Sequence, residues 1–153
     1  MGGRPGNPLA RSTVPPPQTT PQTQARFVDN GNGTFTDRKH RLIGIKNVKA
    51  LGRKAWSEAL SAVRDLANGL YELSDGSNVG DWRLPTRDEL PILFEWKESD
   101  EIAGIPPFDD FWSRDVNPGN TANAWFISID SGVVNHGAKW IENRFWPVRT
   151  LRR

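Results

Sequence analysis

The stretch that decides the fold lies near the middle of the chain and reads Asp81-Trp82-Arg83-Leu84-Pro85-Thr86-Arg87-Asp88-Glu89-Leu90. Thr86 followed three residues later by Glu89 is the pattern of a capping box, in which each side chain binds the other residue's backbone N–H. We therefore expect a helix over residues 87–96 that buries Leu90, Leu93 and Phe94. Pro91 lies just beyond the first turn and lacks an N–H, which predicts a short or distorted helix.

A second helix is predicted upstream, because apolar residues recur there at helical spacing: Trp56, Ala59, Leu60, Val63, Leu66 and Ala67. Strands are predicted on both sides of the helices, at residues 27–28, 34–36 and 41–46, and then at 111–113, 124–130, 133–135 and 145–151. The Asn-Gly pairs at 30–33 favour a tight hairpin between the first two strands. Strands, two helices and again strands indicate an α+β fold with mostly antiparallel strands and chain ends close together.

Residues 1–25 differ in composition from the rest of the chain. They hold six prolines, including Pro15-Pro16-Pro17, and no aromatic residue. Such a segment buries too little apolar surface to fold alone and favours extended geometry. Its two arginines account for the net charge of +2, so residues 26–153 are neutral, which argues against nucleic-acid binding. We expect an extended arm at 1–25, acting as a linker or docking on protein subunits of a larger assembly, and one domain at 26–153.

Groups that could carry catalysis are scarce. The absence of cysteine excludes disulfides and thiolate chemistry. We interpret His40 and His136 as solvated loop residues and Asp109-Asp110 as loop acids with diverging side chains. The turn at 29–33 resembles a calcium loop, but its twelfth position is His40 instead of glutamate. The sequence therefore predicts a non-enzymatic binding module with no catalytic residue, metal or cofactor.

No apolar segment follows Met1, so we expect no secretion signal in the chain as numbered. No stretch is long enough for a transmembrane helix, which predicts no membrane insertion. The expected location is extracellular or on a virion surface, the latter reached by lysis.

Several motifs occur in order along residues 26–151. They are residues 27–37 (FVDNGNGTFTD), 55–60 (AWSEAL), the stretch at 81–90, and then 111–113 (FWS), 123–126 (NAWF), 130–132 (DSG) and 147–149 (PVR). This series resembles the family of domains at the C-terminus of the bacterial collagen-like adhesin Lcl. The resemblance implies a C-type-lectin-like fold, related to the formylglycine-generating sulfatase-modifying domain. It also implies roles in surface attachment, including binding to sulfated glycosaminoglycans in the adhesin.

The chain departs from the family pattern in ways that limit what carries over. Residues 41–45 read Arg-Leu-Ile-Gly-Ile where the family has a Gly-Leu-Met-Trp run, which predicts altered packing of the first strands. The related oxidases act through cysteine, which this chain lacks. The Glu-Pro-Asn and Trp-Asn-Asp motifs of calcium-dependent lectins are also missing, so calcium-dependent sugar binding is not expected.

Similar domains vary in their C-terminal third, which places the expected ligand surface at residues 117–143. Loop amides and aromatics over a rigid sheet are typical of such surfaces. The candidate ligand-binding residues are Asn117, Asn120, Asn123, Asn135, His136, Lys139, Trp140 and Asn143. We expect Trp140 to be exposed, the tryptophans at 82, 112, 125 and 146 to be in the core, and Arg83 and Arg149 to form internal ion pairs.

Two interpretations of function remain. The first is an adhesion module that recognises glycans or a cell-surface receptor. The alternative is a phage virion structural protein, such as a capsid decoration or tail component, whose arm docks on neighbouring subunits. A homo-oligomer is compatible with both.

Overall fold

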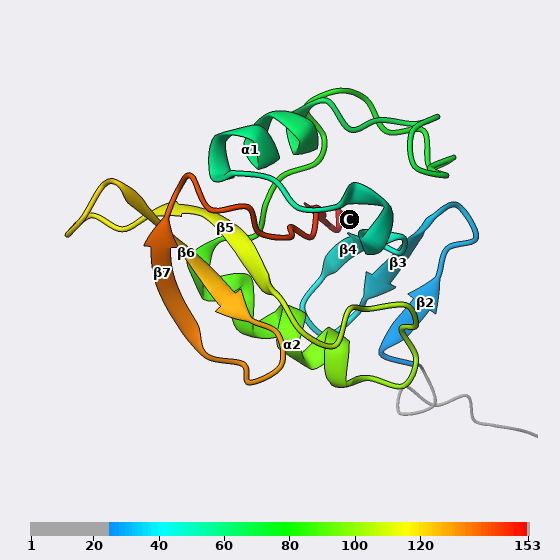
Figure 1. The fold of residues 1–153 in the computed structure, drawn as a ribbon. Helices are drawn as coiled ribbons and strands as arrows, with labels where there is room; N and C mark the ends of the chain where they lie inside the picture. The colour runs from blue at the N-terminus through cyan, green and yellow to red at the C-terminus, as the bar shows by residue number, and fades with distance from the viewer. Residues whose placement is uncertain (1–24, 153) are drawn as a thin grey trace, which may run out of the picture.

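The computed structural model describes residues 25–152, so the predicted arm lies outside the described residues except for Ala25. The described part has an α+β fold (Figure 1). Its elements, in chain order, are β2 (Phe27–Asp29), β3 (Thr34–Asp37), β4 (Leu42–Ile45), the 3-10 turn η4 (Val48–Leu51), α1 (Trp56–Arg64), the 3-10 turn η5 (Arg87–Glu89), α2 (Leu90–Glu98), β5 (Asp110–Val116), β6 (Asn123–Ser128), β7 (Val134–Ala138) and β8 (Val148–Thr150).

The strands form two antiparallel sheets. One has the order β2-β3-β4-β8 and the other the order β5-β6-β7. The first and last strands therefore belong to the same sheet, as the predicted proximity of the chain ends requires. Helix α1 contacts β5, and α2 contacts β6 (Figure 1).

The predicted capping box is present at the start of the second helix. The Thr86 hydroxyl accepts from the Glu89 N–H at 3.2 Å, and the Glu89 carboxylate accepts from the Thr86 N–H at 2.9 Å. One 3-10 turn precedes α2, so Pro91 falls within the first α-helical turn, where its missing N–H costs nothing. The helix is irregular at its start, as predicted, but Pro91 is not the cause, and α2 continues to Glu98.

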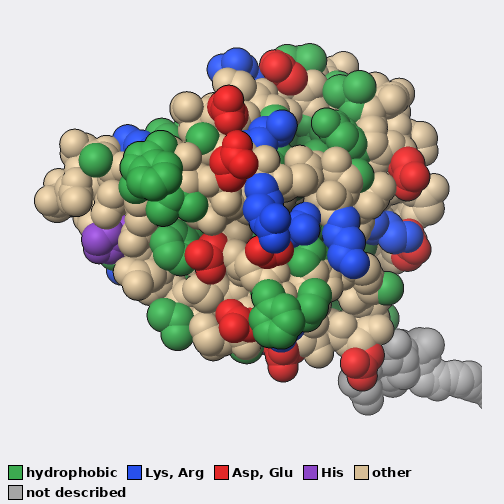
Figure 2. All heavy atoms as spheres, in the orientation of Figure 1, with side chains coloured by type: hydrophobic (Ala, Val, Ile, Leu, Met, Phe, Trp, Pro, Cys, Tyr) green, Lys and Arg blue, Asp and Glu red, His purple; other side chains and the backbone are tan. Residues whose placement is uncertain are grey.

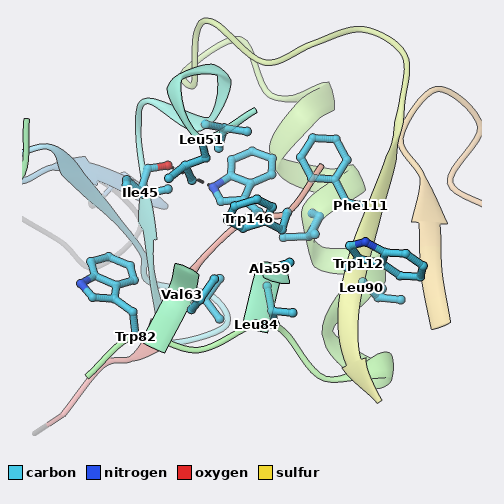
Figure 3. Packing of buried hydrophobic residues seen from close by; sticks show 14 of the residues in the cluster. Ile45, Leu51, Ala59, Val63, Trp82, Leu84, Leu90, Phe111, Trp112 and Trp146 are labelled. Carbon is cyan, nitrogen blue, oxygen red and sulfur yellow. Dashed lines mark hydrogen bonds between the residues drawn. The ribbon is translucent and has the colours of Figure 1, made fainter. Parts of the chain in front are cut away.

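Aromatic side chains join the two sheets into one core. Phe35 of β3 lies edge-on to Trp96 of α2, with ring centroids 4.9 Å apart, and Trp96 lies 5.0 Å from Trp146. Trp146 in turn contacts Phe111 of β5 at 5.8 Å and donates its indole N–H to the Ile45 carbonyl at 3.0 Å (Figure 3). The tryptophans at 82, 112 and 146 are buried, as predicted.

Gly44 of β4 lies directly against two aromatic rings of the core. A Cβ at this position would lie 2.6 Å from the Phe35 ring and 3.0 Å from that of Trp96. The aromatic pair thus fills the space that a larger residue in β4 would need.

Buried charges tie the secondary-structure elements together. Asp37 is fully buried and accepts two hydrogen bonds from Arg26, each 2.9 Å long, and one from the Trp96 indole at 2.8 Å. The internal ion pairs predicted for Arg83 and Arg149 are also present. Arg83 binds Glu89 at 2.7 Å, and Arg149 binds the buried Asp75 at 3.3 Å.

Candidate ligand-binding surface

Two loops and the start of α1 meet at one end of the molecule. The N–H of Lys139 donates to the Ala122 carbonyl at 3.1 Å, and the Lys139 carbonyl accepts from the Trp56 N–H at 2.9 Å. These bonds join the β5–β6 loop to the turn after β7, and that turn to the start of α1. We call residues 117–122 and 139–142 together the end surface. Hydrophobic side chains gather over this end of the molecule, at the left of Figure 2.

Trp140 dominates the end surface. Its side chain is 79% exposed, the largest value for any large apolar residue among those described, and the neighbouring Ile141 is 40% exposed. This confirms the predicted exposure. Lys139 is held differently, because its ammonium lies 4.7 Å from the centroid of the Trp56 ring. The turn therefore presents a free indole beside a cation that is already positioned.

The amides of the β5–β6 loop hold its shape. The side-chain oxygen of Asn117 accepts from the Gly119 N–H at 3.0 Å, and that of Asn120 accepts from the Ala122 N–H at 3.2 Å. Such i to i+2 bonds are the usual way in which asparagine stabilises a turn. Each oxygen has a second lone pair, so a ligand could still use one acceptor position on each oxygen as well as the Nδ2 donors. Sequence reasoning missed this role, although the asparagine spacing could have indicated it.

Asn123 and His136 face each other across β6 and β7. The Asn123 amide lies 2.9 Å from His136 Nδ1, and the His136 ring lies edge-on to Trp125, with centroids 5.0 Å apart. The interpretation of His136 as a loop residue is therefore wrong, because the side chain is fixed within a strand. The placement of Trp125 in the core holds only in part: the residue is half-buried and packs against the core, and its ring carries Arg87 on one face.

The other two candidate ligand-binding residues, Asn135 and Asn143, are bonded within the domain or less accessible. Asn135 is exposed, but its side-chain oxygen accepts from the His136 N–H at 2.8 Å. Asn143 is only 8% exposed, and its backbone pairs with that of Lys54. The structure thus joins Lys139 and Trp140 to Asn117 and Asn120, and removes Asn143 from the accessible surface.

A groove of about 480 Å³ runs along α1 next to the end surface. Glu142 belongs to both features. The other lining residues are Arg53, Lys54, Ser57, Glu58, Ser61 and Ala62. The lining is mostly polar and mixes both charges, which suits a hydrophilic ligand better than an apolar one.

The acids and the histidine that the sequence offered as possible catalytic groups, Asp109, Asp110 and His40, form contacts within the domain. Asp109 forms ion pairs with Arg144 and Arg53, each at 2.7 Å. Burial raises the pKa of Asp109, but the hydrogen bonds from the two arginines have a larger combined effect and hold the pKa below its usual value. Asp110 instead accepts from Ser128, so the two acids diverge as predicted. His40 is not a freely solvated residue, because its ring lies 3.3 Å from the Glu95 carboxylate.

Within residues 25–152, no three histidine, aspartate or glutamate side chains are grouped so that they could hold a metal ion. No helix in that range combines the length and apolarity needed to cross a membrane.

The chain was compared with models of known families. The family model described as the Lcl C-terminal domain matches residues 33–149. The matched range includes both sheets, except for β2 and the last residue of β8, and the whole of the end surface. A search of curated proteins finds no match to the chain.

Proposed function

Because the chain belongs to the Lcl C-terminal domain family, which is named after an adhesin, we propose that the protein is a non-enzymatic adhesion module. In this proposal the domain has a C-type-lectin-like fold and is displayed on the surface of a cell or a virion. Its end surface recognises glycans or other cell-surface molecules. The family assignment supports adhesion, and the ligand is inferred from the residues of the end surface.

The exposed Trp140 is the observation that carries the proposal. An indole that is 79% exposed contributes little to the stability of the domain. Tryptophan is enriched among the residues that contribute most to binding, because its large ring can be desolvated by a partner. The turn-forming Asn117 and Asn120 keep the surrounding loop rigid, which lowers the entropy cost of binding.

The test compares Trp140→Ala with a matched control in the same protein. Phe108→Ala is the control, because Phe108 is another exposed aromatic side chain, at 68%, and lies in a different loop. Binding to a glycan array and to intact cells should fall about tenfold or more for Trp140→Ala and stay unchanged for Phe108→Ala. Both variants should unfold at the same urea concentration as the unmodified protein. Equal binding by all three proteins would remove the end surface from the proposal.

A further inference from the structure

A groove of about 500 Å³ lies beside β2, at the end of the molecule opposite β7 (Figure 1). We call it the β2 groove. Its apolar lining consists of Phe27, Phe35, Ile102 and Ala103. The two phenyl rings meet edge-on, with centroids 6.1 Å apart. The β2 groove therefore offers an aromatic surface, whereas the groove along α1 is mostly polar.

The charged lining of the β2 groove leaves one acid over. Asp29 and Lys46 form an ion pair at 2.6 Å. Glu101 also lines the groove, and its backbone N–H donates to the Ser99 hydroxyl at 3.1 Å. The Glu101 carboxylate makes no hydrogen bond or ion pair with any residue of the described range 25–152. An occupant that complements this groove is apolar and carries a cation nearby.

The chain itself contains such a segment at residues 11–17, which read Arg-Ser-Thr-Val-Pro-Pro-Pro. Consecutive prolines favour polyproline II geometry, and aromatic-lined grooves bind such segments because the preformed helix loses little entropy on docking. Arg11 precedes Pro15 by four positions, which places it about 12 Å away along a polyproline II helix. Residues 1–25 contain no acid that could compete for Arg11.

The segment is tethered beside the groove. The description of the chain begins at Ala25, and Phe27 is itself part of the lining. Arg26 is fixed between them, because its side chain binds the buried Asp37 and its carbonyl accepts from the Arg38 N–H at 2.8 Å. Residues 18–26 can span up to about 30 Å when extended, which is enough to turn back into the groove. A short tether also gives an effective concentration on the order of millimolar.

We propose that Pro15, Pro16 and Pro17 of the same chain dock in the β2 groove, with Arg11 paired with Glu101. The aromatic lining supplies the apolar contact, the spare carboxylate supplies the charge, and the tether supplies the concentration. The arm then rests on its own domain, and the end surface stays uncovered, since the two features lie at opposite ends of the molecule (Figure 1).

Paramagnetic NMR on the ¹⁵N-labelled full chain tests the docking. The chain has no cysteine, so Ser12→Cys provides a single site for a nitroxide label. The label should broaden the amide signals of Ile102 and Ala103 strongly and leave that of Gly119 in the β5–β6 loop unchanged. The matched control carries the same label with all three prolines replaced by serine, which keeps the length of the arm. Equal broadening with and without the prolines would overturn the proposal.

A mixed sample identifies the chain that supplies the arm. It combines ¹⁵N chains that carry no nitroxide with nitroxide-labelled chains that carry no ¹⁵N. Docking within one chain predicts no broadening of Ala103 in this mixture. Broadening as strong as in the doubly labelled chain would show that the arm lies on a second copy, which contradicts docking within the chain.

Glu101→Gln tests the proposed pair with Arg11. In the absence of the nitroxide, the Ala103 amide shift should move toward its value in the triple-serine protein, corresponding to a docking constant about two- to fivefold lower, since an exposed ion pair is removed. Glu58→Gln is the matched control, because Glu58 is also an exposed acid but lines the groove along α1. It should leave the Ala103 shift unchanged. Equal effects of the two variants would contradict the placement of Arg11. All these readouts are independent of ligand binding by the end surface, so the docking and the proposed function can fail separately.

Discussion

Replacing Asp37 by asparagine should be among the most damaging single-atom changes in this domain. The carboxylate is fully buried and accepts two hydrogen bonds from Arg26 and one from Trp96. The Arg26 side chain is 27% exposed. We therefore take the lower end of the stabilisation typical of a hydrogen bond to a charged group, about 1.5 kcal/mol for each of its two bonds, which gives about 3 kcal/mol in total. That sum agrees with the cost of about 3–5 kcal/mol for breaking a buried pair from one side.

The pH dependence provides a second measurement on the same variant. Burial, the largest single influence, raises the pKa of Asp37, but hydrogen bonds from Arg26 and Trp96 outweigh it and place the pKa below its usual value. A lowered pKa in the folded state means that the stabilisation is present above the unfolded pKa, about 3.9, and is lost as the pH falls through the folded value. The gap in stability between the unmodified protein and Asp37→Asn should therefore be full at pH 7 and shrink below pH 4.

Urea unfolding followed by tryptophan fluorescence, repeated from pH 3 to pH 7, measures both effects. Asp29→Asn is the matched control, since Asp29 also pairs with a cation, Lys46, at 2.6 Å, but its side chain is 62% exposed. Its effect should be small, because water screens an exposed pair. A loss below about 1 kcal/mol for Asp37→Asn at pH 7, or a similar loss for both variants, would refute the reasoning from burial.

Two further predictions concern glycines. Gly33→Ala should destabilise the domain by about 1–3 kcal/mol, because φ is +89° and the new Cβ would lie 2.7 Å from the Glu72 carbonyl oxygen. Gly31→Ala, at φ +71° with open space around it, should cost less, and equal losses in urea unfolding would contradict the role of the close contact. Gly44→Ala should cost about 1–3 kcal/mol through overpacking against Phe35, and an unchanged unfolding midpoint would show that the ring can move aside.

Local sequence rules predicted much of the fold, because the features concerned are built from neighbours in the chain. The capping box at Thr86 and Glu89 needs only a spacing of three residues, and the helical apolar pattern placed α1. The end of α1 was less accurate, since the apolar spacing continues to Ala67 while the helix ends at Arg64. Leu66 is buried beyond the helix, so burial and not helicity explains its apolar character.

The candidate site could be predicted only in part. The exposure of Trp140 could be predicted, because residues 137–140 (Gly-Ala-Lys-Trp) have the composition of a loop. The contact between Arg87 and Trp125 could not, because the two residues are brought together by the packing of η5 on the sheet and have no shared local pattern. His136 was assigned to a loop because its neighbours are small and polar, yet pairing with Trp125 in β6 makes that segment a strand.

The pairing of β4 with β8 has a consequence for how the protein is made. Ile45 and Trp146, which are hydrogen-bonded in the core, are 101 positions apart in the chain. During synthesis the hairpin of β2 and β3 can form early, but the free edge of β4 has no neighbour until residues 148–150 leave the ribosome. While residues 46–147 are being made, the nascent chain therefore exposes one unpaired edge of β4 and the apolar side chains of Leu42 and Ile45, and exposed apolar surface beside an open strand edge is the feature that promotes aggregation.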